Sequence, residues 1–145
     1  MKIVLQRISR ASVTVDGSIV GSIDNGYVVL LGFGEGDDKP KVGKMVDKIQ
    51  KLRIFPDENG KTNLSIGDVG GGILVISQFT LYADCRKGNR PSFTDAAEPA
   101  LAEELYDCFI ACAQEKFDKV AHGIFGADMK VELINNGPFT VILED

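Results

Sequence analysis

Apolar and polar residues alternate along the first part of the chain with the two-residue period of a β-strand. Residues 2–9 and 11–16 follow this period, and Asp16 and Gly17 form a dipeptide that is typical of tight hairpin turns. Residues 27–31 are a continuous apolar run, which indicates a central strand covered on both faces. The pattern therefore predicts that the chain opens with antiparallel strands.

Two later segments carry apolar residues at the three- and four-residue spacing of an amphipathic helix. The first follows Asp38, and lysines fill its other face. The second follows Phe93, and we expect Thr94 or Asp95 to cap its first turn. Both helices are predicted to pack on the same sheet. Their apolar positions are Val42, Met45, Val46, Ile49 and Leu52 in the first helix, and Leu101, Leu105, Cys108, Phe109, Cys112 and Phe117 in the second.

A dense apolar run over residues 73–82 predicts a strand buried on both faces, yet three polar residues interrupt it. Because side chains alternate along a strand, we expect Gln78 and Thr80 on one face and Ser77 on the other. Buried polar groups need hydrogen-bond partners, so their presence in such a strand calls for a specific reason. The polar end of this strand is therefore a candidate binding site.

Two more strands are predicted near the end of the chain, over residues 129–133 and 139–143. The segment between them contains Asn136, Gly137 and Pro138, which by composition alone is a turn. We therefore predict an α/β fold, a single domain over residues 1–145. Its mixed, mostly antiparallel and barrel-like sheet would have about seven strands, with two amphipathic helices on one side.

Charge narrows the possible partners of the chain. A net charge of −5 argues against a protein that coats nucleic acid through its overall positive charge. The segment RKGNR over residues 86–90 is an exception, with three cations and no acid. It follows the polar end of the 73–82 strand, so the two features together indicate an anionic ligand.

Two further features bear on compartment and metal binding. The opening MKIVLQRISRASV has an apolar run too short for a signal peptide or a membrane helix, so we expect a cytoplasmic protein. Cys108 and Cys112 are four residues apart on a predicted helix, without further ligands nearby. That spacing favours small buried thiols over a metal pair. We predict no metal and no cofactor.

General motifs do not identify a reaction, because the sequence has no zinc motif, P-loop, nucleophile elbow or spaced carboxylate pair. The GFGEG segment over residues 32–36 follows a predicted strand, but its glycine spacing and acidic residues do not suit a dinucleotide. The only histidine, His122, has no carboxylate placed in sequence to orient it. Activation of Thr80 or Ser77 by His122 is therefore disfavoured.

Two segments are far more specific. SQFT over residues 77–80 and NNGPFT over residues 135–140 resemble the two signature motifs of the D-aminoacyl-tRNA deacylases. The similarity covers nearly the whole chain and includes LRIF, DVGG, RKG, RPSF and FGADM in the family's order. The resemblance implies a hydrolase that cleaves the ester joining a D-amino acid, or glycine, to the terminal adenosine of tRNA. Such an enzyme performs chiral proofreading in translation.

The resemblance also implies roles for the residues of the first motif. Ser77, Gln78, Phe79 and Thr80 would form the catalytic site, with the backbone N–H groups of the last three facing the developing oxyanion. A threonine nucleophile needs a base, and none lies near Thr80 in sequence. We therefore favour a water molecule positioned beside the ribose 2′-OH over a covalent intermediate.

The second motif is implied to act across subunits. Members of the family are homodimers, and a Gly-cisPro dipeptide of each subunit completes the partner's active site. This dipeptide corresponds to Gly137-Pro138, whose backbone would exclude L side chains but not glycine. Asn136 and Met129 are further candidates for substrate binding.

The resemblance assigns the basic segment to tRNA. Arg86, Lys87 and Arg90 would hold phosphates near the 3′ end, whereas without the resemblance the same segment is a solvated turn.

Two other functions remain to be weighed against hydrolysis of D-aminoacyl-tRNA. A non-catalytic module would bind aminoacyl or RNA ends without cleaving them, which the intact SQFT and NNGPFT segments disfavour. An editing domain would remove a mischarged L-amino acid, as domains appended to some archaeal synthetases do. The Gly137-Pro138 dipeptide and the length of a free-standing domain disfavour that function.

Overall fold

The fold is organised around β1 (Lys2–Val15), a long strand that pairs antiparallel with three other strands in the computed structural model of residues 1–145. Its first half pairs with β3, its second half with β2, and β8 follows it on both halves. The other elements are β2 (Ser18–Ile23), β3 (Gly26–Gly32), α1 (Lys39–Lys51), β4 (Phe55–Pro56), β5 (Thr62–Leu64), β6 (Gly72–Ser77), the 3-10 helix η1 (Phe79–Tyr82), α2 (Pro99–Lys116), β7 (Val120–His122) and β8 (Lys130–Glu144).

The main sheet has six strands and is mixed. Its order is β2-β1-β3-β6-β7, with β8 paired to β1, and the β3–β6 and β6–β7 pairs are parallel. The sheet curls until β2 approaches β7, where a side chain on Gly21 would lie 2.9 Å from the backbone oxygen of His122. No hydrogen-bonded pairing joins β2 to β7, so the barrel is nearly closed. The predicted fold class is confirmed.

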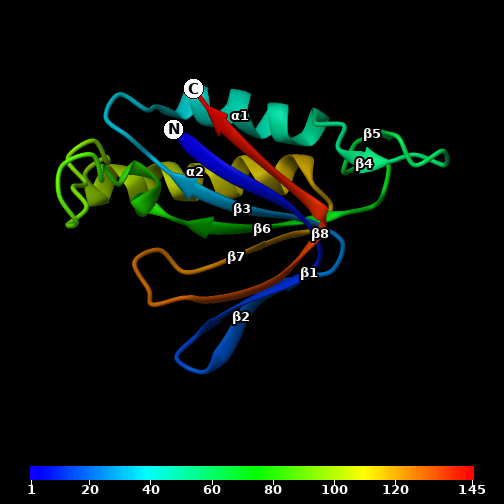
Figure 1. Cartoon of the computed structure of the whole chain (residues 1–145), viewed down its shortest axis with the longest axis horizontal. Coiled ribbons are helices and arrows are strands. Elements are labelled where there is room, and N and C mark those ends of the chain that lie inside the picture. The colour runs from blue at the N-terminus through cyan, green and yellow to red at the C-terminus, as the bar shows by residue number, and fades with distance from the viewer.

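Apolar side chains form two clusters, one on each face of the sheet. Helices α1 and α2 lie side by side over one face (Figure 1), and most of the buried side chains lie between them and the sheet. The smaller cluster fills the inside of the curl and comprises Ile8, Ala11, Val13, Val28, Leu74 and Ile76. The prediction that both helices cover the same sheet is confirmed.

The predicted β1–β2 turn is confirmed, whereas the predicted start of α2 is not. Asp16 and Gly17 form the β1–β2 turn with φ values of 49° and 78°, as a tight hairpin with positive φ requires. Asp38 caps α1, because its carboxylate accepts the backbone N–H of Lys41 at 2.9 Å. The start of α2 was predicted wrongly. The helix begins at Pro99, a residue that suits the first helical turn, and its preceding residue makes no side-chain cap.

Three strand predictions are also corrected. The strands predicted over 2–9 and 11–16 form one strand, β1, which ends at Val15, and those predicted over 129–133 and 139–143 form one strand, β8, which begins at Lys130. In each case the ladder shifts register where the apolar alternation breaks. The strand predicted over 73–82 ends at Ser77, and the chain then forms η1.

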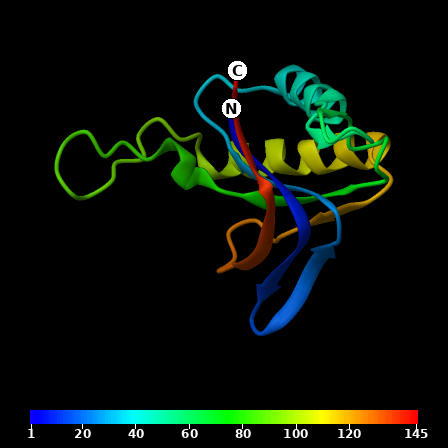
Figure 2. The ribbon, with the colours of Figure 1, turned by 45° about the vertical axis from the view of Figure 1, so that its right-hand side comes forward.

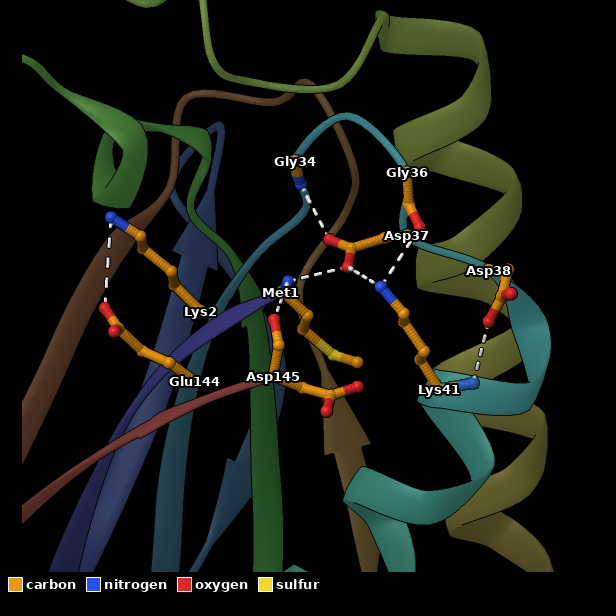
Figure 3. Close-up of polar contacts among 9 residues, drawn as sticks. All are labelled: Met1, Lys2, Gly34, Gly36, Asp37, Asp38, Lys41, Glu144 and Asp145. Atoms are coloured by element: carbon orange, nitrogen blue, oxygen red, sulfur yellow. Dashed lines mark hydrogen bonds and ion pairs between the residues drawn. The ribbon is translucent and has the colours of Figure 1, made fainter.

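A buried ion pair fixes the start of β1 to the loop before α1 (Figure 3). The amino group of Met1 donates to Asp37 Oδ1 at 2.7 Å, and Asp37 Oδ2 accepts the backbone N–H of Gly34 at 2.8 Å. The two groups are only 0 % and 3 % exposed, so each depends on the other for charge compensation. The ammonium of Lys41 lies farther off, 3.9 Å from the same carboxylate.

Neither helix combines the length and the apolar character needed to cross a membrane.

Candidate active site

The SQFT segment leaves the sheet where β6 ends. Ser77 is the last residue of β6 and pairs with Leu31 of β3. The backbone N–H of Gln78 then donates to the Leu31 carbonyl at 2.7 Å, which is the last bond between this segment and β3. Gln78 has φ −145° and ψ 75°, so the chain turns there into η1, which contains Phe79 and Thr80.

This turn brings Gln78 and Thr80 together, although the reason differs from the predicted strand alternation. The side-chain amide of Gln78 donates to the hydroxyl oxygen of Thr80. The N–H of Gln78 is already bound to β3, so it does not face a ligand as expected. Phe79 and Thr80 are the first residues of η1, and the first N–H groups of a helix lack acceptors within it. Two N–H groups, not three, are therefore candidates for an oxyanion site.

An apolar cleft of about 430 Å³ opens beside this turn. Nine of its 14 lining residues are hydrophobic, and Ser77 and Gln78 supply polar groups at one side, a composition typical of small-ligand sites. Met129 also lines the cleft, and its sulfur packs so closely on Gly123 that a side chain at Gly123 would collide with it. The other lining residues are Ile76, Phe79, Ala96, Ala97, Pro99, Ala102, Phe125, Gly126, Ala127, Asp128 and Val131.

The basic segment forms a loop that projects from the body of the molecule (Figure 2). Backbone hydrogen bonds of 2.8 and 3.0 Å between Asp84 and Ser92 close its base. Arg86 donates two hydrogen bonds to the Asp84 carboxylate, at 2.9 and 2.7 Å, and these with the Arg86 backbone N–H lower the pKa of Asp84 to about 2. Lys87 and Arg90 are exposed and form no ion pair. The loop thus offers two free cations and one shared cation.

The NNGPFT segment is a bulge in β8. Ile8 pairs with Asn135 and Gln6 with Thr140, so the four residues between Asn135 and Thr140 face a single residue of β1. Asn136, Gly137 and Pro138 are exposed there. The chain contains no cis peptide bond, so the predicted cis isomer at Gly137-Pro138 is wrong for this structure. Trans is the favoured isomer of an X–Pro bond by about 0.5–1 kcal/mol, and the exposed ring of Pro138 has little packing to reverse that preference.

Arg7 of β1 supports this bulge through hydrogen bonds of its side chain and its backbone. Its side chain is 9 % exposed, and its Nε donates to the Asn136 carbonyl at 3.1 Å. The guanidinium lies 5.0 Å from the ring centre of Phe139, and the Asn135 amide donates to the Arg7 carbonyl at 2.9 Å. Gly137 has φ 101°, and a side chain on it would collide with the Arg7 guanidinium. Only glycine takes this positive φ without strain and also leaves room for the guanidinium.

Arg7 was not predicted from the sequence, although a signal was present. Ile3, Leu5 and Arg7 occupy the same face of β1, and that face is buried. A cation at the third position of such a series has to find buried acceptors, and the carbonyls of Asn136 and Ile54 supply them.

The two motifs lie far apart within one chain. Three strand spacings separate β6 from β8, about 14 Å across the sheet. Ser77 pairs with Leu31, which itself pairs with Ile3, so Ser77 lies level with Ile3 of β1. Arg7 is four residues from Ile3, which adds a separation of about 13 Å along the strand direction. In Figure 1, β6 points to one end of the molecule and the bend of β8 lies at the other. Gly137 and Pro138 do not line the cleft.

His122 is exposed at the end of β7, where its Nδ1 lies 2.9 Å from the Gly123 carbonyl. It forms no ion pair with a carboxylate and does not contact Thr80 through a hydrogen bond. The residue therefore lacks the partners that a catalytic triad requires.

Comparison with known families decides the relationship of this chain. The family model described as D-Tyr-tRNA(Tyr) deacylase matches residues 4–144. The chain belongs to that family. Curated D-aminoacyl-tRNA deacylases of Teredinibacter turnerae and Koribacter versatilis are 51 % and 53 % identical to it, each over 99 % of this chain. The alignments cover 99 % and 97 % of those relatives. The prediction of the family is thus confirmed, and it is a family of enzymes.

Solved structures agree with the fold. One titled c-Myc DNA Unwinding Element Binding Protein is 41 % identical, covers 100 % of this chain and 99 % of its own, and has a TM-score of 0.94. Another, titled as a probable eukaryotic D-amino acid tRNA deacylase, has a TM-score of 0.86 at 17 % identity, with coverage of 98 % and 97 %. The second similarity supports the fold alone.

Proposed function

We propose that this protein hydrolyses D-aminoacyl-tRNA to free tRNA and a D-amino acid in the cytoplasm. One observation carries the proposal: in a chain of this family, Gln78 and Phe79 line an apolar cleft of about 430 Å³, and the side chain of Gln78 holds Thr80 beside it. A cleft of that volume suits a terminal aminoacyl nucleoside. The turn supplies polar groups at the wall where the ester would lie.

The chemistry follows from the groups at this turn. Water adds to the ester carbonyl, and the N–H groups of Phe79 and Thr80 stabilise the resulting oxyanion. The acyl carbon–oxygen bond to the ribose then breaks, the leaving ribose oxygen takes the proton that the water gave up on addition, and the carboxylic acid loses its own proton to solvent and leaves as a carboxylate. The Thr80 hydroxyl accepts a hydrogen bond from Gln78, which is not a base, so Thr80 orients the reactants and does not attack. The neighbouring ribose 2′-OH positions the water.

We infer that the complete site is assembled in a two-fold symmetric homodimer. Within one chain the Gly137-Pro138 bulge lies about 14 Å across and about 13 Å along the sheet from Ser77, so a second copy is needed to bring it to the cleft. The bulge is exposed and is fixed by the hydrogen bond from Arg7, so a partner subunit can contact it as a rigid element.

Selection of the D-enantiomer is assigned to this bulge. Backbone atoms of Gly137 and Pro138 would occupy the volume that an L side chain needs, and Asn136 and Met129 would flank the amino acid. Glycine has no side chain to exclude, so glycyl-tRNA is expected to be hydrolysed as well. Discrimination by backbone shape works by excluding the wrong substrate and does not require tighter binding of the right one.

The tRNA itself is proposed to contact the basic loop. Lys87 and Arg90 are unpaired and exposed, and Arg86 shares its charge with Asp84. Phosphates near the 3′ end would bind these cations with the salt dependence of counterion release.

Deacylation of D-Tyr-tRNA, L-Tyr-tRNA and Gly-tRNA by the purified protein tests this function. We expect rapid release of D-tyrosine and glycine, with L-tyrosine released no faster than in buffer. Tight binding of D-Tyr-tRNA without hydrolysis would favour a non-catalytic binding module. Equal cleavage of the two tyrosyl substrates would exclude a chiral proofreading role.

A further inference from the structure

Two large aromatic side chains remain exposed beside the cleft. Phe79 is 57 % exposed and Phe93 is 37 % exposed, and their ring centres lie 5.0 Å apart at an angle of 62°. An edge-to-face pair leaves the face of one ring uncovered by the other. Exposed apolar side chains that adjoin one another indicate a binding surface, whereas exposed apolar residues scattered singly do not.

The position of the pair connects two other features. Phe79 lines the cleft, and Phe93 follows directly after Ser92, whose backbone closes the basic loop against Asp84. The aromatic pair therefore lies between the wall of the cleft and the base of the loop that carries Lys87 and Arg90. A single-stranded chain of nucleotides that runs from the cleft toward those cations would pass over the pair.

We propose that Phe79 and Phe93 form a stacking platform for the base that precedes the terminal adenosine of the tRNA 3′ end. The inference rests on the proposed function. A cleft of about 430 Å³ takes one aminoacyl nucleoside, so the next base has to lie outside it. Single-stranded nucleic acids are held by this combination of aromatic faces under the bases and cations along the backbone. Phe93 is thus a tRNA-positioning residue outside the catalytic turn.

The test compares two substrates and three variants. D-Tyr-tRNA carries the penultimate base, whereas D-tyrosyl adenosine lacks it. Phe93→Leu keeps an apolar side chain but removes the aromatic face, and Phe93→Trp keeps a face. Leu101→Ala is the matched control, because Leu101 is also 37 % exposed and does not line the cleft.

We expect Phe93→Leu to raise the KM for D-Tyr-tRNA by about 5- to 150-fold, the range found for loss of one stacked base. Its kcat, and both constants for D-tyrosyl adenosine, should stay within about twofold of the unmodified protein. Phe93→Trp should keep the KM of the unmodified protein, and Leu101→Ala should also leave it unchanged.

Equal losses on both substrates for Phe93→Leu, or an unchanged KM for D-Tyr-tRNA, would overturn the platform. Failure of the unmodified protein to cleave either substrate would instead refute the proposed function. In that case binding of an uncharged CCA-ended oligonucleotide still decides the inference, because Phe93→Leu should weaken it relative to Leu101→Ala.

Discussion

Replacing Gly137 by alanine should destabilise the protein through two separable effects. The residue has φ 101°, a conformation that costs an L side chain about 1–2 kcal/mol. The new Cβ would also meet the Arg7 guanidinium, which would have to move away from the Asn136 carbonyl. Loss of one hydrogen bond from a buried charged group costs about 1.5–3 kcal/mol. Together these give about 2.5–5 kcal/mol for Gly137→Ala.

Thermal unfolding followed by circular dichroism measures this cost. At about 3 °C per kcal/mol for a chain of this size, Gly137→Ala should lower Tm by about 8–15 °C. Gly17→Ala is the control for strain alone, because Gly17 also has a positive φ of 78° and a side chain there would meet nothing within 4 Å. Its Tm should fall by only about 3–6 °C.

A double-mutant cycle isolates the collision with Arg7. In an Arg7→Ala background, Gly137→Ala should cost no more than Gly17→Ala does. Strong coupling between positions 7 and 137 is therefore expected. Additive effects in the cycle, or a Gly137→Ala protein that melts with the unmodified one, would refute the conclusion that Arg7 supports the bulge.

Three other changes test the fold and the site. Asp37→Asn leaves the buried Met1 ammonium without a counter-charge and should cost about 3–5 kcal/mol in chemical denaturation, whereas Asp38→Asn keeps an exposed cap and should cost under about 0.5 kcal/mol. Thr80→Ala should slow single-turnover deacylation by about 10- to 100-fold without abolishing it, and an acyl-enzyme trapped on Thr80 would contradict its positioning role. Neutralising Lys87 and Arg90 together should reduce the slope of log affinity for tRNA against log salt by about 1.4–1.8, and an unchanged slope would return the loop to a solvated turn.

The amphipathic helices and the first hairpin were predictable because each depends on a local pattern. Helix α1 begins directly after Asp38, where the apolar series was predicted to start, and Asp16 and Gly17 take the positive φ values that their turn requires. Strand boundaries were not predictable in the same way. β1 changes partner from β3 to β2 near Ser9 and Arg10, where both residues are exposed, so the alternation breaks although the strand continues.

The end of β6 was predicted wrongly for a different reason. Residues 79–82 are apolar enough to continue a strand, but β3 ends at Gly32 and offers them no partner, and the last bond to β3 is made by the Gln78 N–H. The candidate site residues were named from the resemblance to a family, whereas their separation across the sheet depends on pairings between distant strands. Arg7 was missed because its acceptors, at Asn136 and Ile54, are remote in sequence.

The central claim is that a D-selective hydrolytic site combines the Gln78–Thr80 turn of one subunit with the Gly137-Pro138 bulge of its partner. Mixing two impaired variants, Gln78→Ala and Pro138→Ala, under conditions that exchange subunits tests it most directly. Half of the resulting dimers are mixed, and each holds one intact site, so the mixture should recover about a quarter of the unmodified rate on D-Tyr-tRNA and none on L-Tyr-tRNA. A mixture no more active than the average of its two components would contradict the shared site.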